Sequence, residues 1–280
     1  MEDCGYGIFQ LLRVGRGCRL FAKPDSWSVM LVTDSPRQAP RPPYSLPPII
    51  EAVIQIVYPD KFAASRADAF RSKLSPLYDS KTDLKQVTAH IEPERRKAEF
   101  QDVPQTRFAS NDQTDAIVVS PDGLLWTRLA PYPGWDVFAE RVARDLKLAI
   151  KHLSIGKPSR IGMRFINRID VPATGDVVRY EDYLAINIDL PPQISSVDNY
   201  GWRFECPFPT LGLRAVLQSA VVEPEVPSHL SFLLDIDVIA MNELPADLDS
   251  MLSHLEKMRT LKNELFELSI RDKAREQFSR

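Results

Sequence analysis

The sequence has few residues that build metal or disulfide sites. It contains three cysteines, Cys4, Cys18 and Cys206, and four histidines in 280 residues. No CxxC pair occurs, and no histidine has a second histidine or cysteine three or four residues away, which is the spacing of local zinc sites. The sequence therefore predicts no disulfide framework and no metal site, and Cys206 is expected to be a free thiol.

Glycine is also scarce, with 11 residues, and the glycine-rich loops that cradle phosphates are missing. Neither the dinucleotide-binding pattern nor the P-loop pattern is present, and no GxSxG segment could place a nucleophilic serine on a strand-to-helix turn. These absences disfavour Rossmann, P-loop and serine-hydrolase chemistry. The motifs assign no catalytic residue and no cofactor.

Long apolar runs are missing as well, because no stretch approaches the roughly 18–20 residues that span a bilayer. The apolar stretch 7–12 is followed closely by three arginines and has no cleavage-site pattern, which argues against a signal peptide. The expected location is the cytoplasm, without a membrane partner.

What is present is typical of a globular protein. Hydrophobic residues make up 44% of the chain, and 35 basic residues face 38 acidic ones, for a net charge of −3. A chain of this length can bury a sizeable core. The slight acidity argues against a general nucleic-acid coat.

The first 46 residues differ from the rest. Residues 1–29 mix glycine, arginine, cysteine and aromatics without a period, and residues 35–48 carry six prolines, which favours an extended tether. We expect translation to start at or near Met30. The predicted organisation is an extension and tether over 1–46, followed by a single domain over 47–280.

Hydrophobic periodicity predicts the elements of this domain. Alternation over 50–58 indicates a strand whose even-numbered side chains face the core. Further strands are expected over 160–171, 200–206, 211–222 and 229–240, with a hairpin over 117–129 whose turn is closed by Gly123 at positive φ. Helices are expected over about 61–75, 135–153 and 246–270, and residues 79–105 as a polar, partly helical excursion.

This order predicts an α+β fold. Short hairpin links require antiparallel strands, so the sequence indicates an antiparallel sheet with helices mainly on one face and a long C-terminal amphipathic helix. A hairpin followed by a helix occurs at 116–153 and again at 211–270. This repeated order raises the possibility of a ββα duplication.

The strand over 160–171 carries an arginine stripe. Arg160, Arg164 and Arg168 have the same parity, so they share one face at intervals of about 13 Å. Asp235 and Asp237 share a face of a later strand. Two interpretations stay open: these residues form cross-strand ion pairs, or the arginines bind an extended or phosphorylated anion. The two aspartates lack a third acid at a defined spacing, so no metal is assigned to them.

Apolar side chains offer a possible interaction surface. Trp202 and Phe204 alternate on one strand, so they pack in the core or, if their face of the sheet is uncovered, form an exposed patch. The C-terminal helix has a seam that includes Leu261 and Leu265. That seam packs on the sheet or pairs with a second copy of the chain.

Four segments carry a resemblance to a known family: PPIIEAV at 47–53, SPDG at 120–123, RIGMRFINRI at 160–169 and LDID at 234–237. Over about 47–278 the chain resembles a sporadically distributed family of uncharacterised prokaryotic proteins known only by a family number. The resemblance implies an accessory or defence-type role and provides no catalytic residues.

The function expected from the sequence is a non-catalytic, protein-binding module, chaperone-like or antitoxin-like, with a protein partner or with self-association through the C-terminal helix. The alternative is an enzyme or sensor that binds a small phosphorylated ligand through Arg164 and Arg168. Nucleic-acid binding is disfavoured by the net charge.

Overall fold

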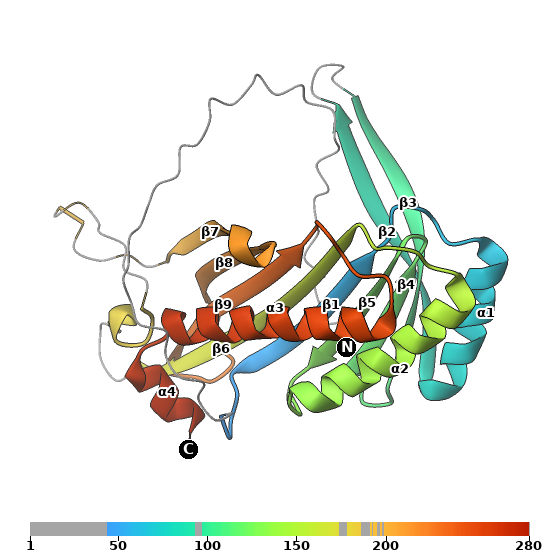
Figure 1. Cartoon of the computed structure of the whole chain (residues 1–280). Helices are drawn as coiled ribbons and strands as arrows, with labels where there is room; N and C mark the ends of the chain where they lie inside the picture. Colours follow the sequence, from blue (N-terminus) through green and yellow to red (C-terminus); the bar gives the residue numbers. More distant parts are fainter. Residues whose placement is uncertain are drawn as a thin grey trace.

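The computed structural model describes residues 44–92, 97–173, 178–185, 191, 193–194, 197 and 199–279. Its strands are β1 (Ile49–Val57), β2 (Ser80–Glu92), β3 (Lys97–Ala109), β4 (Asp115–Ser120), β5 (Gly123–Leu129), β6 (Arg160–Pro172), β7 (Gly201–Phe208), β8 (Leu213–Val222) and β9 (His229–Ala240). All nine form one antiparallel sheet in the order β2-β3-β4-β5-β1-β6-β9-β8-β7 (Figure 1).

The helices are α1 (Ala64–Leu74), α2 (Trp135–Leu153), α3 (Leu248–Ser269) and α4 (Asp272–Phe278), with short 3₁₀ turns at Ser75–Leu77, Tyr180–Asp182 and Pro209–Leu211. Figure 1 shows α1, α2 and α3 on the same face of the sheet. The fold is therefore α+β with a long C-terminal helix, as predicted. Within the described residues, no helix combines the length and apolarity that a bilayer crossing requires.

The core lies between the sheet and these helices. Ala52, Ile54 and Ile56 of β1 are fully buried, which confirms that the even-numbered side chains of this strand face the core. Phe165 of β6 and Phe138 of α2 are each 1% exposed in the same cluster. The alternation of buried and part-buried side chains along β1 and β6 follows from the two-residue period of a strand.

We call the other face of the sheet the open face. It carries the side chains of each strand that alternate with the core-facing ones. The strand register assigns to it Glu51, Val53 and Gln55 of β1, Arg160, Gly162, Arg164, Ile166, Arg168 and Asp170 of β6, and Ser231, Leu233, Asp235, Asp237 and Ile239 of β9. Most of these side chains are half-buried, because a flat sheet shields the lower part of each side chain with its neighbours.

The prediction for residues 79–105 is wrong. This segment belongs to β2 and β3, which pair along 13 residues each from Ser80–Ala109 to Glu92–Lys97. Figure 1 shows this hairpin extending beyond the rest of the sheet. The described side chains over 81–86 of β2 are exposed except for that of Leu84, which is part-buried. This strand therefore needs no apolar alternation, and the sequence signal for a strand is lost.

The turn between β4 and β5 forms where predicted, but Gly123 does not have a positive φ. A Cβ atom at this position would lie 3.1 Å from the backbone oxygen of Ile56 and 3.1 Å from the Ser120 hydroxyl. Glycine is therefore explained by the close approach of β1 and not by the conformation of the turn.

The predicted tether reaches too far along the chain. The Tyr44 ring packs edge-on against Phe266 of α3 and Phe278 of α4, and the Leu46 N–H donates to the carbonyl of Phe278 at 2.9 Å. Residues 44–46 therefore already contact the domain, because one aromatic side chain in the proline-rich stretch finds an apolar site. The remainder of 1–46 lies outside the described residues.

Candidate functional site

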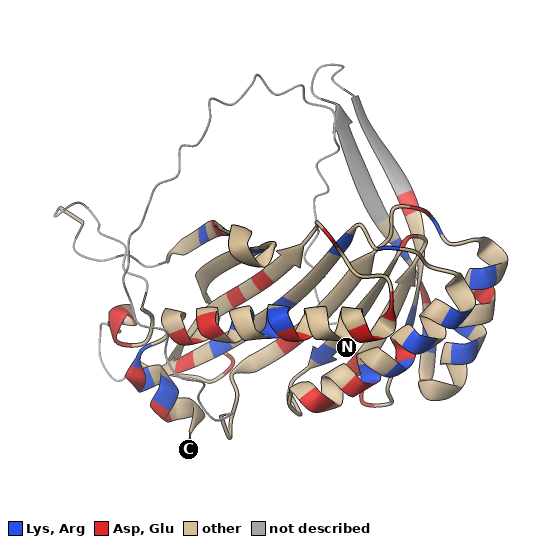
Figure 2. Cartoon of the chain, viewed as in Figure 1, with Lys and Arg blue, Asp and Glu red and all other residues tan. Residues whose placement is uncertain are grey.

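The arginine stripe and the two aspartates come together as predicted. β6 and β9 are neighbours in the sheet, with Arg164 directly opposite Asp237 and Ile166 opposite Asp235. All of these charged side chains lie on the open face. Figure 2 shows basic and acidic positions side by side on the middle strands. We call Arg160, Arg164 and Arg168 the arginine ladder.

The strongest pair of the ladder joins Arg164 to Asp235. The Arg164 Nε donates to Oδ1 of Asp235 at 2.8 Å, and the guanidinium reaches the second carboxylate oxygen as well. Gln218 of β8 donates to the same carboxylate, which is only 5% exposed. The hydrogen bonds that Arg164 donates to Asp235 raise the pKa of Arg164 above its ordinary value. This carboxylate is therefore fully engaged.

The other two arginines of the ladder are paired as well. Arg160 donates to the side-chain oxygen of Gln55 at 2.6 Å and lies 3.6 Å from Asp237. Arg168 pairs with Asp170 at 2.9 Å and with Glu225. Each guanidinium of the ladder thus has a carboxylate partner. Arg160 and Arg164 pair across to β9, as cross-strand ion pairing predicts, whereas Arg168 pairs within its own strand and with the loop before β9. An anion would have to displace one of these partners.

Glycine at position 162 is explained by the ladder. A Cβ atom there would lie 2.9 Å from Nη1 of Arg160 and about as close to the rest of the guanidinium. The missing side chain leaves room for Arg160 to lie over the open face and reach Gln55. Any larger residue at position 162 would collide with the guanidinium of Arg160, which stands two residues earlier on the same strand.

Carboxylates outnumber guanidiniums at the centre of the open face, where Glu51, Asp235 and Asp237 face Arg160 and Arg164. Burial raises the pKa of Asp237 to about 6, against the opposing effect of Arg160, and burial also raises the pKa of Glu51. At neutral pH the ionised carboxylates therefore leave no excess positive charge for an anion at the centre of the open face, and Asp237 takes up a proton under mildly acidic conditions.

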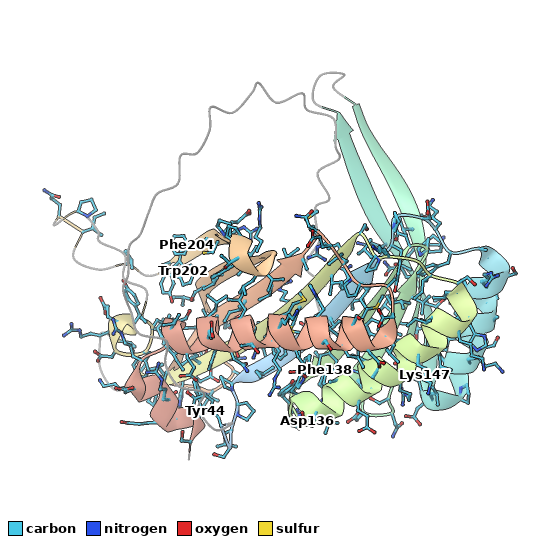
Figure 3. The ribbon with its side chains drawn as sticks, viewed as in Figure 1. Tyr44, Asp136, Phe138, Lys147, Trp202 and Phe204 are labelled. Atoms are coloured by element: carbon cyan, nitrogen blue, oxygen red, sulfur yellow. The ribbon has the colours of Figure 1, made fainter. Side chains whose placement is uncertain are left out.

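Trp202 and Phe204 lie on β7, the last strand of the sheet. Their rings stack with centroids 5.0 Å apart (Figure 3), and Phe204 is 46% exposed while Trp202 packs partly against the core. They stand opposite Ser219 and Leu217, two buried side chains of β8. The patch is therefore on the helix-bearing side of the sheet, not on its open face, and it is exposed because it lies at the margin. We call this pair the aromatic edge.

The prediction that Leu261 and Leu265 form an interaction surface is wrong. They are 3% and 9% exposed, and both belong to the core cluster between α3 and the sheet. The seam of the C-terminal helix is thus satisfied within the chain, because α3 lies along β9 and β6 and buries its apolar side there.

Sequence reasoning missed a buried carboxylate on α2. Asp145 is 0% exposed, accepts hydrogen bonds from Trp126 Nε1 at 3.1 Å and from the Tyr78 hydroxyl, and pairs with Arg144. By accepting these hydrogen bonds, the carboxylate ties α2 to β5 and to Tyr78, which follows the 3₁₀ turn after α1. The signal in the sequence was the position of Asp145 on the apolar face of the helix, three residues after Val142.

A buried lysine on α3 was also missed. Lys262 is 8% exposed, and its Nζ lies 4.1 Å from the centre of the Phe165 ring. Burial and, to a smaller extent, nearby Arg259 lower the pKa of Lys262 to about 7, and Glu267 opposes this change.

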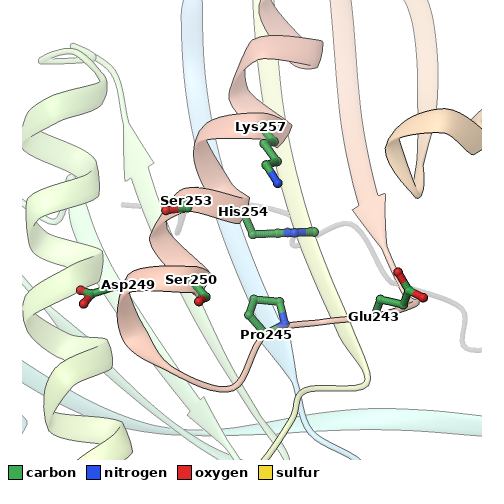
Figure 4. A pocket seen from close by; sticks show the side chains of 7 residues that line it. All are labelled: Glu243, Pro245, Asp249, Ser250, Ser253, His254 and Lys257. Atoms are coloured by element: carbon green, nitrogen blue, oxygen red, sulfur yellow. The ribbon is translucent and has the colours of Figure 1, made fainter.

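A pocket of about 370 Å³ opens at the start of α3 and is lined by Glu243, Pro245, Asp249, Ser250, Ser253, His254 and Lys257 (Figure 4). Burial, and then Lys257, lower the pKa of His254, whose Nε2 has no hydrogen-bond partner in the described part of the chain. Within that part, no three His, Cys, Asp or Glu side chains converge as a metal site requires. The pocket therefore presents a neutral imidazole close to the positive charge of Lys257.

Comparison of the chain with models of known protein families finds no match, and comparison with curated proteins finds none either. The family resemblance carried by the four sequence segments therefore stays a prediction, and the functional argument rests on the geometry.

Proposed function

We propose that the protein is a non-catalytic recognition module that binds an extended segment of a partner protein along β7. The observation that supports this proposal most directly is the aromatic edge: a stacked Trp202–Phe204 pair, part of it exposed, on a strand that ends the sheet.

The backbone of β7 provides the first part of the interaction. Its inner side pairs with β8 from Gly201–Ala220 to Phe208–Leu213, and no strand of the described residues pairs with its outer side. An edge strand presents N–H and C=O groups that a second extended chain can satisfy. A partner segment that adds to this edge gains main-chain hydrogen bonds whatever its sequence.

The aromatic pair provides the second part. Side chains of an added strand alternate between the two faces, so every second residue of the partner lies on the same side as Trp202 and Phe204. Large apolar side chains at those positions cover the exposed part of Phe204 and gain contact area with both rings. The preferred occupant is therefore an extended segment with apolar residues at alternate positions.

The opposite side of β7 favours a partner strand whose side chains on that side are polar. Arg203 pairs with Glu205 at 2.8 Å, Glu205 lies 3.3 Å from Arg214 of β8, and about half of each of these side chains is exposed. The charged groups on this side pair with one another within the sheet and stay hydrated. An amphipathic partner strand, apolar on one side and polar on the other, matches both sides of β7.

The alternative of a phosphorylated ligand at Arg164 and Arg168 is not carried forward. Asp235 and Asp170 already occupy the positions at which a phosphate would contact these guanidiniums. Binding there would require a buried carboxylate to be left without its partner, which costs several kcal/mol.

The proposal is tested with peptides selected from a displayed library of random dodecapeptides against the full chain. We expect enriched peptides to alternate large apolar and polar residues, and Phe204→Ser to weaken their binding by about 10-fold or more, as truncation of an aromatic hot spot does. Fluorescence anisotropy of the labelled peptides measures this change.

The matched control is Val137→Ser, since Val137 is an equally exposed apolar residue on α2. This variant is expected to leave the affinity unchanged, whereas alternate N-methylation of the peptide backbone abolishes binding by removing main-chain donors. Selected peptides that bind Phe204→Ser as tightly as the wild type would refute the proposal, as would N-methylated peptides that still bind.

A further inference from the structure

A second pocket, of about 500 Å³, lies where the end of β1, the start of α1 and the end of α2 meet. This volume is within the range of small-molecule sites. Its charged lining consists of Lys61, Arg66 and Lys157 with a single carboxylate, Asp60. Neither lysine has an ion pair with another described residue. The pocket therefore presents an excess of positive charge that the protein leaves uncompensated.

The arginine of this pocket is positioned by the fold. Arg66 donates from Nη1 to the hydroxyl of Ser154, the residue that caps the end of α2 in a left-handed conformation. This contact holds the guanidinium between the two helices, and it places positive charge beside the negative end of α2. Arg66 thus offsets the repulsion between an anion and the C-terminal end of α2.

The start of α1 adds a second attraction for anions. Ala63, which lines the pocket, is the N-cap of α1 and has no side chain that could accept from the first N–H groups. The first turn contains no acidic residue either. The N-terminal end of this 11-residue helix therefore keeps its partial positive charge and its free donors.

A buried hydroxyl without a partner is the independent sign of a ligand. Tyr58 lines the pocket, is 4% exposed and packs edge-on against Phe62, another lining residue. Its hydroxyl has no hydrogen-bond partner in the described part of the chain. Buried polar groups in native proteins are nearly always satisfied, so a group outside the protein is expected to complete this one.

We propose that this pocket binds the phosphate group of a small phosphorylated molecule. Lys61, Arg66 and Lys157 supply the charge for a dianion, the free N–H groups at the start of α1 supply directed donors, and the Tyr58 hydroxyl bonds to a polar group of the rest of the molecule. The site is separate from the arginine ladder and from the aromatic edge, so it does not depend on the function proposed above.

Isothermal titration of the full chain with glucose 6-phosphate, inorganic phosphate and glucose tests the proposal. We expect saturable binding of both phosphates and none of glucose. The variant Lys61→Gln/Lys157→Gln is expected to bind them about 10-fold more weakly or worse, because two charge-assisted contacts are lost. The variant Lys73→Gln/Lys151→Gln is the control, since it removes the same charge from exposed lysines of α1 and α2 outside the pocket.

Tyr58→Phe separates a ligand contact from a structural role. It removes only the unpartnered hydroxyl, so the ligand-free protein is expected to keep its melting temperature while its affinity for glucose 6-phosphate falls several-fold. The proposal is overturned by the absence of saturable phosphate binding, by equal loss of affinity in the two lysine variants, or by equal binding of glucose. Unchanged affinity in Tyr58→Phe would remove this hydroxyl from the site.

Discussion

At the residue scale, Lys262 makes the stability of the protein depend on pH in a defined direction. Its pKa falls from 10.5 to about 7 on folding, so between these values the unfolded chain binds more protons than the folded one. The free energy of unfolding therefore rises with pH over this range, by up to about 1.4 kcal/mol for each pH unit.

Lys262→Met tests this directly, because methionine keeps the length of the side chain and removes the charge. We expect the variant to be about 1–3 kcal/mol more stable at pH 7, since a buried charge without a close carboxylate is replaced by an apolar group. Its stability should also depend less on pH between 7 and 10. Urea denaturation at several pH values measures both effects, with exposed Lys257→Met as the control. Equal pH dependence in wild type and Lys262→Met would show that Lys262 stays charged in the fold.

Periodicity alone could have located Lys262 and Asp145 on buried faces. Lys262 follows Met258 by four residues and precedes Leu265 by three, so it lies on the same side of α3 as both. The partners could not have been predicted. Trp126, which donates to Asp145, is distant in sequence, and only the packing of α2 on the sheet brings it within reach.

At the element scale, the pairing of β6 with β9 is held by more than backbone hydrogen bonds. Arg164 and Asp235 bridge the two strands on the open face, and Gln218 extends the contact to β8. Because Asp235 is almost fully buried, removal of its guanidinium partner leaves a charge with only one neutral donor.

A double-mutant cycle measures this coupling. Arg164→Met is expected to lower the free energy of unfolding by about 3–5 kcal/mol, as loss of one partner of a buried pair does. The double variant Arg164→Met/Asp235→Leu should lose less unfolding free energy than the two single variants lose together, by about 1–3 kcal/mol. The half-exposed pair of Arg203 and Glu205 serves as the control, with coupling below about 1 kcal/mol. Coupling at Arg164 no larger than this control would contradict the account.

Hydrophobic alternation predicted the strands that bury the side chains of one face and leave the other face partly exposed. β1 and β6 alternate cleanly, since helices cover one side of each, and their bounds agree with the prediction to within a few residues. The pair β2–β3 was missed because the described part of β2 is largely exposed on both faces and so lacks an apolar alternation. Local patterning carries no information about a strand whose two faces meet the same solvent.

At the scale of the whole molecule, the order of strands decides which residues form a site. The hairpins could be predicted from their turns, but the insertion of β1 between β5 and β6 joins segments distant in sequence. The sequence predicted the covered side of β1 but left open whether Trp202 and Phe204 lie on the side of the helices, and that decides their role. The arginine ladder lies on the open face and is paired, whereas Trp202 and Phe204 lie on the other side at the margin.

The central claim is that recognition takes place at the β7 edge and not at the arginine ladder. The most direct test records backbone amide chemical shifts of the full chain as a selected peptide is added. The account predicts that the largest changes fall within 201–208 and in the β8 residues paired with them. Changes centred on Arg160, Arg164 and Arg168, with β7 unaffected, would contradict it.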